Sequence, residues 1–139
     1  LLEAANKRGV KKVTIASSSS VYGTNSKVPF SEADPIFSTI SPYAASKGGI
    51  VQLTKSLAVA WAKDNIQVNA LLPGWFVTDL TRGIEERDPA RHDNISRRIP
   101  SGRWGDPSEL GGSALFLASA ASNYVTGSTL TVDGGYSAS

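Results

Sequence analysis

The chain has 139 residues with a formal net charge of +2, and 40% of the residues are hydrophobic. This length suits one domain with a buried core. The lack of cysteine excludes disulfides and thiolate metal ligands. No continuous basic patch with interleaved aromatic residues is present, which argues against nucleic-acid binding, and no apolar run approaches the roughly 20 residues that span a bilayer.

The N-terminal stretch predicts a helix tail, a strand and a long loop. Residues 1–8 have a helical pattern that ends at Gly9, a residue type that commonly caps helices. Residues 12–17 are β-branched and predict a buried parallel strand. Residues 18–41 predict a polar loop, and a loop of this length is more often functional than a plain connection. Because the chain begins without methionine inside a helix pattern, we expect a piece of a longer protein.

The middle of the chain predicts a long helix and a second strand. Ser41-Pro42 combines a capping serine with proline at the first helical position, and the helix runs to about Lys63. One face of this helix carries the large apolar residues Ile50, Leu53, Leu57 and Trp61. Residues 66–72 predict the second strand, which Pro73-Gly74 closes.

The C-terminal part predicts a second long loop, a helix and a third strand. The loop covers residues 75–105 and holds most of the arginines. Asp106-Pro107-Ser108-Glu109 is a capping box that opens a helix ending near Ala118, and residues 129–132 predict the last strand. Strands that alternate with helices predict an α/β fold. We expect one partial domain over 1–139, the C-terminal half of a doubly wound, Rossmann-like parallel sheet of about three strands.

The most informative motif is Tyr43-Ala44-Ala45-Ser46-Lys47 at the start of the long helix. Residues four positions apart on a helix face the same side. The lysine charge favours the phenolate form and lowers a tyrosine pKa that is otherwise about 10. The serines at 17–20 offer a hydroxyl that could hold a substrate oxygen. These groups suffice to move a proton while a cofactor moves a hydride.

In this context the motif resembles the short-chain dehydrogenase/reductase family, and the resemblance covers essentially the whole chain. It implies that Tyr43 is the catalytic acid/base and that Lys47 tunes this tyrosine and binds the nicotinamide ribose. It also implies that Tyr43, Pro73, Gly74 and Thr78 contact the cofactor, which is NAD or NADP. The implied reaction is hydride transfer on a carbonyl/alcohol substrate.

The catalytic serine has two candidates. Ser18 stands 25 residues before Tyr43, and Ser20 stands 23 before it. The single-domain branch of the family has a shorter spacing. The longer one, together with Val21-Tyr22-Gly23, resembles the extended branch, typified by nucleotide-sugar epimerases such as UDP-glucuronate 4-epimerase. The pattern of that branch favours Ser18.

The two ends of the chain resemble different branches of the family. Residues 1–47 resemble the extended branch, whereas residues 48–139 resemble the single-domain branch. We therefore hypothesise a chimera, engineered or recombined, that is joined near 43–47. The alternative is a natural single-domain member with a long loop before Tyr43.

A dinucleotide fingerprint is missing from the sequence. No glycine-rich turn follows a first strand, and the pairs Gly48-Gly49 and Gly111-Gly112 fall inside predicted helices. We therefore expect little activity from the chain alone. The alternative function is a non-catalytic fragment or chimera that serves as a folding or assembly unit, and a weaker alternative is a nucleotide-sugar epimerase fragment.

Other polar and aromatic residues receive plainer predictions. His92 is expected to be solvated and no metal site is expected, because the chain has one histidine and no cysteine. The loop arginines either grip an anionic substrate or form a solvated face. Trp75, Phe76 and Trp104 either line a substrate pocket or pin the loop to the core. Asn69 is expected to be structural.

An unpaired strand edge predicts association. In the complete fold another strand would pair with residues 12–17, and this chain does not encode it. An open, β-branched edge invites pairing with another chain. We therefore predict a homo-oligomer through this edge or through helix 42–63. A cytoplasmic location is the default expectation.

Overall fold

The computed structural model describes residues 2–18 and 42–138. Within this part, the side chains of residues 2, 3, 6 and 42–44 are not described. Most of the predicted loop 18–41 therefore lies outside the described residues, and with it Ser20 and Val21-Tyr22-Gly23. The same holds for the side chain of Tyr43.

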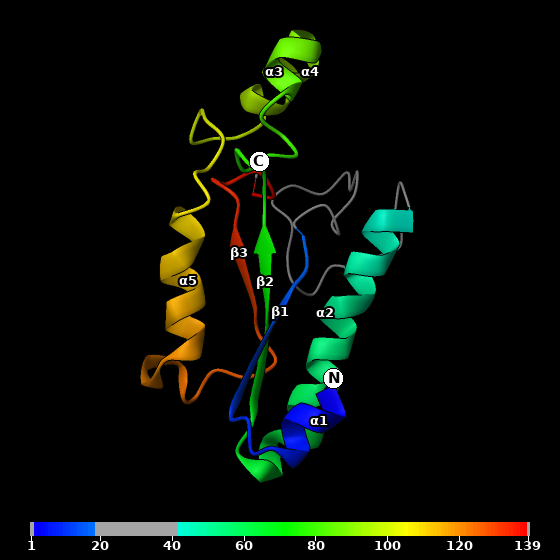
Figure 1. Cartoon of the computed structure of the whole chain (residues 1–139), viewed down its shortest axis with the longest axis vertical. Coiled ribbons are helices and arrows are strands. Elements are labelled where there is room, and N and C mark those ends of the chain that lie inside the picture. Colours follow the sequence, from blue (N-terminus) through cyan, green and yellow to red (C-terminus); the bar gives the residue numbers. More distant parts are fainter. Residues whose placement is uncertain (1, 19–41, 139) are drawn as a thin grey trace.

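The centre of the fold is a parallel sheet of three strands in the order β1-β2-β3. The strands are β1 (Lys12–Ala16), β2 (Gln67–Pro73) and β3 (Thr129–Val132). Lys12 pairs with Gln67, and Ala70 pairs with Thr129. Helix α2 (Pro42–Trp61) covers one face and helix α5 (Glu109–Ala118) covers the other (Figure 1). The predicted α/β fold, a Rossmann-like half with three parallel strands, is confirmed.

The shorter helices connect these layers. They are α1 (Leu2–Lys7), η2 (Ala62–Asp64), α3 (Ile84–Arg87), α4 (Pro89–Arg97) and η3 (Ala120–Ser122). Figure 1 shows α1 at the amino ends of the strands, whereas α3 and α4 stand beyond their carboxyl ends. No helix among residues 2–18 and 42–138 is long and apolar enough to cross a membrane.

The hydrophobic core lies around β2, because both faces of this strand are covered. Alternate residues Val68, Ala70 and Leu72 pack with residues of α2, and each is 0% exposed. Between them, the buried Asn69 donates from Nδ2 to the Val125 carbonyl (2.9 Å) and accepts from the Ser128 amide (3.1 Å). This confirms the structural role predicted for Asn69, since a buried amide must be hydrogen-bonded.

Two predictions about packing hold only in part. Strand β1 is not fully buried: Thr14 and Ala16 are exposed, and because alternate residues share one face of a strand, this face of β1 is incompletely covered. The most buried residues of α2 are Val51, Thr54 and Ala58. Of the predicted face, Leu57 and Trp61 pack partly buried against the core, whereas Leu53 is 43% exposed. Small side chains on this side let α2 lie close to the sheet. For this reason the most buried residues of the helix are not the large apolar ones of the predicted face. Association through the β1 edge or α2 stays a prediction.

The prediction of an irregular loop over 75–105 is also wrong, since this segment contains α3 and α4. The start of α4 has a clear cap: Pro89 occupies the first helical turn, and the Asp88 carboxylate accepts from the Arg91 amide at 3.0 Å. This is the same capping logic that predicted α2. It was missed because the segment is polar and rich in arginine.

The predicted capping box before α5 is confirmed. The Glu109 carboxylate accepts from the Asp106 amide at 2.7 Å, and the Asp106 carboxylate accepts from the Ser108 amide at 2.8 Å. These bonds satisfy amides that the first turn of a helix leaves without partners. They also fix where α5 begins relative to the preceding segment.

Candidate functional site

The carboxyl ends of the three strands meet at one edge of the sheet. Ser17 follows β1, Gly74 follows β2 and Asp133 follows β3. Parallel α/β sheets bind their ligands outside this edge. Figure 1 shows that the first turns of α2 and the base of the α3–α4 segment lie at the same end. The edge is therefore the place to look for the predicted site residues.

Ser17 joins β1 to α2 at this edge. Its side chain is 5% exposed, and its hydroxyl donates to the Lys47 carbonyl at 2.7 Å. Its amide donates to the Leu71 carbonyl at 2.8 Å. Ser18 follows directly and is half-buried. The structure thus brings the strand that ends in serines against the helix that carries Lys47.

Lys47 lies in the corner between α2 and β1. Its ammonium nitrogen is 3.5 Å from the Ala16 carbonyl oxygen, and the residue is half-buried. Tyr43 lies one helical turn earlier on α2. Ser18 thus directly follows the strand end that contacts Lys47, and the catalytic roles of Ser18, Tyr43 and Lys47 stay predictions. Sequence reasoning missed the anchoring role of Ser17, which a serine at the end of a buried run could have suggested.

The Pro73-Gly74 turn is packed tightly against the segment after β3. The Gly74 amide donates to the Val132 carbonyl at 2.9 Å. A Cβ on residue 74 would overlap the Asp133 Cβ and lie 2.7 Å from the Asp133 Cα. Packing therefore explains the glycine without any ligand. The predicted cofactor contacts of Pro73 and Gly74 stay predictions.

Thr78 lies in a tight hydrogen-bonded turn. Its amide donates to the Thr81 hydroxyl oxygen at 2.8 Å, and the two hydroxyl oxygens are 3.1 Å apart. The Thr81 hydroxyl also lies 2.6 Å from the Phe76 carbonyl, to which it donates. These bonds fix Thr78 close to the end of β2. Its predicted contact with a cofactor is untested.

Residues 77–104 form a unit that we call the helical cap. Its two ends meet in a parallel bridge between Phe76 and Gly105, the neck of the cap. There the Val77 amide donates to the Gly105 carbonyl and the Gly105 amide donates to the Trp75 carbonyl, both at 2.9 Å. The cap therefore leaves the carboxyl edge of the sheet and returns to it at the same point.

A small apolar cluster holds the cap together. Ile95, Ile99 and Trp104 are buried in it, and Trp75, Ile84 and Tyr136 pack around them. The rings of Trp75 and Trp104 have centroids 5.1 Å apart and are tilted by 46°. The two tryptophans thus pack together at the base of the cap, and a role in a substrate pocket stays a prediction.

The prediction of a solvated His92 is wrong. Its ring stacks on Trp104 with a centroid distance of 5.0 Å and an interplanar angle of 27°, and 26% of its side chain is exposed. It lies on α4, where the helix turns one side toward the tryptophan. The sequence assigned His92 to an irregular loop, so it could not predict which side of a helix His92 would occupy.

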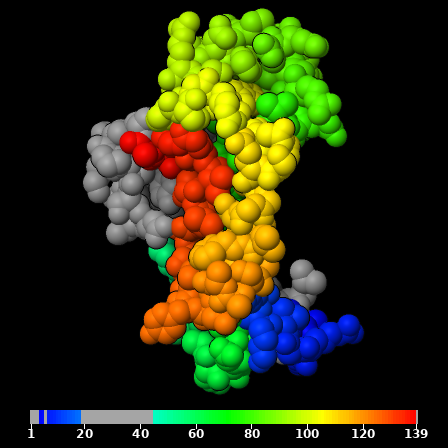
Figure 2. Space-filling view, turned by 90° about the vertical axis from the view of Figure 1, so that its left-hand side faces the viewer, coloured from blue at the N-terminus to red at the C-terminus, as the bar shows by residue number. Residues whose placement is uncertain are grey.

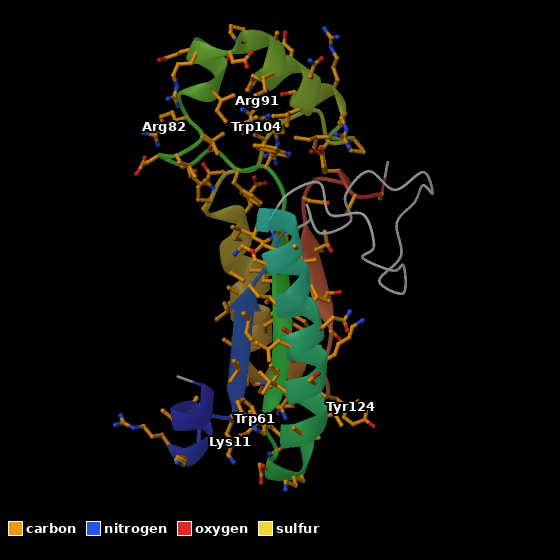
Figure 3. The ribbon with its side chains drawn as sticks, turned by 90° about the vertical axis from the view of Figure 1, so that its right-hand side faces the viewer. Lys11, Trp61, Arg82, Arg91, Trp104 and Tyr124 are labelled. Carbon is orange, nitrogen blue, oxygen red and sulfur yellow. The ribbon has the colours of Figure 1, made fainter. Side chains whose placement is uncertain are left out.

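The arginines of the cap mostly point to solvent. Figure 3 shows Arg82 and Arg91 at the outside of the cap, with Trp104 nearer the sheet. Arg82 lies 3.5 Å from the Asp79 carboxylate, but both side chains are largely exposed. Exposed pairs of this kind contribute little to stability. This arrangement fits the predicted solvated face, and binding of an anionic substrate stays untested.

A cavity of about 130 Å³ lies where the neck, the start of α5 and the segment after β3 meet. Its lining residues are Trp75, Phe76, Ser101, Arg103, Gly105, Glu109, Val132, Asp133 and Gly134. The described residues contain no cluster of side chains suited to a metal ion.

Arg103 and Glu109 form a two-bonded ion pair beside this cavity. The two nitrogen–oxygen distances are 2.8 and 2.7 Å. The hydrogen bond from Arg103, followed by the bond from the Asp106 amide, lowers the pKa of Glu109 to about 2. The same pair raises the pKa of Arg103. The pair ties the end of the cap to the first turn of α5.

This ion pair predicts a pH-dependent contribution to stability. The pKa of Glu109 falls from 4.5 in the unfolded chain to about 2 in the folded one, so the contribution is complete above about pH 4.5 and is lost toward pH 2. We expect Glu109→Gln to lower the urea unfolding midpoint at about pH 6, and to do so less at about pH 3. Glu86→Gln on α3 is the control. An equal loss at both pH values would contradict the prediction.

Residues 12–137 match the family profile described as enoyl-(acyl carrier protein) reductase. The chain therefore belongs to this family of short-chain dehydrogenases/reductases. The chain is 50% identical over 97 residues to 5-keto-D-gluconate 5-reductase of Escherichia coli K12, which covers 70% of this chain and 38% of the relative. It is 50% identical over 96 residues to galactitol 2-dehydrogenase (L-tagatose-forming) of Cereibacter sphaeroides, covering 69% and 37%.

Solved structures support the same assignment. A gluconate 5-dehydrogenase from Burkholderia cenocepacia, in complex with NADP and tartrate, superposes with a TM-score of 0.79 at 41% identity. The superposition covers 99% of this chain and 49% of that one. The chain thus spans under two-fifths of the length of the curated relatives named above and about half of this solved structure.

Proposed function

We propose that this chain carries the proton-transfer half of an NAD(P)-dependent oxidoreductase that interconverts a ketone and a secondary alcohol of a sugar acid or polyol. The family membership supports the reaction type. The names of the relatives, a ketogluconate reductase and a galactitol dehydrogenase, support the substrate class. The NADP in the gluconate 5-dehydrogenase complex supports the cofactor class.

The observation that carries the proposal is the junction between Ser17 and Lys47. The 2.7 Å bond from the Ser17 hydroxyl to the Lys47 carbonyl fixes the serine-ended strand against α2. The motif residues Ser18 and Lys47 are thereby held at the carboxyl edge of a parallel sheet, where such folds bind their ligands. The chemistry and placement of the donors fit the ribose and nicotinamide end of a dinucleotide.

In the proposed mechanism the residues of this chain bind, orient and move a proton. Lys47 favours the phenolate of Tyr43 and binds the ribose hydroxyls, while the Ser18 hydroxyl orients the substrate oxygen. Tyr43 gives its proton to the carbonyl oxygen in reduction and takes it back from the alcohol in oxidation. Pro73, Gly74 and Thr78 border the cofactor. The nicotinamide, when bound, supplies or accepts the hydride.

A second candidate is a folding or assembly unit without catalytic activity. One observation favours it: the given sequence has no glycine-rich turn between a strand and a helix. The pyrophosphate of a dinucleotide needs such a turn. If this second function is correct, Tyr43 and Lys47 are family residues that act on no cofactor, and the chain alone catalyses no reaction.

The chimera near 43–47 also stays a proposal. The curated alignments cover about 70% of the chain, whereas the family profile matches residues 12–137 across the proposed junction. The extended-branch resemblance of the first part supports the chimera. Peptide mapping of the source polypeptide is the test, and an upstream sequence of the single-domain type would contradict it.

Titration of the purified chain with NADH separates the two functions. Saturable, blue-shifted nicotinamide fluorescence is expected if copies of the chain, or an added cofactor half, complete the site. Lys47→Met should weaken this signal at least tenfold, because it removes the ammonium beside the ribose. Lys55→Met, two turns further along α2, is the matched control. A folded sample without any binding, with or without an added cofactor half, would favour the non-catalytic unit.

A further inference from the structure

The helices of the cap do not rest on the sheet. Figure 1 shows α3 and α4 beyond the carboxyl ends of the strands, and α3 packs chiefly against α4. The orientation of the cap relative to the sheet therefore depends on contacts at its base. Figure 2 shows the C-terminal residues, in red, directly beneath the yellow base of the cap.

These C-terminal residues form a stiff turn that continues from β3. The Asp133 carboxylate accepts from the amides of Gly135 and Ser137, each at 2.9 Å, and from the Ser137 hydroxyl at 2.6 Å. One carboxylate thus satisfies three donors of its own turn. Asp133 also packs against Gly74 at the end of β2. The turn is held by two strands of the sheet at once.

The turn contacts the cap through three features. The Ser101 amide donates to the Gly134 carbonyl at 3.0 Å. The Arg98 guanidinium lies over the ring of Tyr136, with its Cζ 4.5 Å from the ring centroid. The ring also packs around the buried cluster of Ile95, Ile99 and Trp104. A cation over an aromatic face is attractive, and more so when it is partly removed from water.

We propose that the turn 133–137 is a clasp that sets the position of the helical cap, with Arg98 and Tyr136 as positioning residues. A cavity of about 130 Å³ lies beside this joint, and Ser101, Asp133 and Gly134 are among its lining residues. The clasp itself does not depend on catalysis. Its consequence for substrate binding rests on the proposed function, because the cap stands over the edge that holds Lys47.

Amide hydrogen exchange on the whole chain tests the clasp. Tyr136→Leu keeps an apolar side chain but removes the ring face, and we expect amides of the cap, such as those of His92 and Gly102, to exchange roughly tenfold faster. Sheet amides, such as that of Ser17, should keep their rates. Tyr136→Phe retains the ring face, and its cap amides should exchange more slowly than those of Tyr136→Leu. Tyr124→Leu, at the opposite end of the molecule (Figure 3), is the matched control.

The outcomes separate positioning from general stability. Unchanged cap exchange in Tyr136→Leu, or equal acceleration in cap and sheet, would overturn the clasp. If that variant does not fold, Arg98→Met replaces it, with the same expected pattern and the same contrary result. In an enzyme completed with a cofactor half, a raised KM with little change in kcat would extend the clasp to substrate binding. Faster cap exchange with an unchanged KM would leave the clasp standing and contradict its extension to substrate binding.

Discussion

Tyr43→Phe, in an enzyme completed with a cofactor half, is expected to lower kcat by about 10²–10⁴-fold, the usual contribution of a general acid/base. The substitution removes one hydroxyl and leaves the helical position of the side chain unchanged. The dissociation constant for NADH should change by less than about threefold, because Lys47 and the Pro73-Gly74 turn are intact. Steady-state kinetics and nicotinamide fluorescence measure the two quantities.

A matched substitution makes this result specific. Tyr124→Phe removes the same hydroxyl from a side chain that is fully exposed far from the cap. It should leave both kcat and cofactor binding at the parent values. Turnover retained by Tyr43→Phe would remove Tyr43 from the proposed mechanism. A parallel loss of cofactor binding would instead make Tyr43 a binding residue.

Gly74→Ala is expected to destabilise the fold by about 1–3 kcal/mol or more, as overpacking does in tightly packed sites. The new methyl group would overlap Asp133 and lie 2.7 Å from its Cα, which is backbone and cannot swing aside. The end of β2 and the turn after β3 would have to separate. Urea unfolding at neutral pH measures the change in the free energy of unfolding.

Gly49→Ala is the control with the opposite sign. Gly49 lies inside α2, and a Cβ there meets nothing within 4 Å. Alanine is favoured over glycine in a helix interior by about 1 kcal/mol, so this variant should be more stable than the parent. A Gly74→Ala variant as stable as the parent would show that the two strand ends are not tightly apposed.

Local signals in the sequence were sufficient for the sheet and for the helices with strong caps. The β-branched runs located β1 and β2, and the capping box located α5. Helices α3 and α4 were missed although Asp88-Pro89 is a capping signal, because a polar, arginine-rich segment has little apolar periodicity. The buried face of α2 was misjudged because residue size was taken as a guide. Small residues face the sheet there, where the helix approaches closely.

The site was predictable to the extent that it depends on a continuous motif. Tyr43 and Lys47 share one helix, and Ser18 follows a recognisable strand. The bond from Ser17 to Lys47 joins residues 30 positions apart. The contact of Gly74 with Asp133 joins the ends of two different strands. Such contacts depend on how the elements meet in space, and neither residue carries a local sign of its partner.

The bridge between Phe76 and Gly105 makes the segment between them an exchangeable module. Its two ends are fixed side by side, so changes of length or sequence inside it need not disturb the sheet. Doubling the length of such a loop costs only about 0.6 kcal/mol in closure entropy. Related proteins could therefore differ in substrate through changes in the cap alone. The proposed proton transfer by Tyr43 and Lys47, elsewhere on the same edge of the sheet, would stay the same.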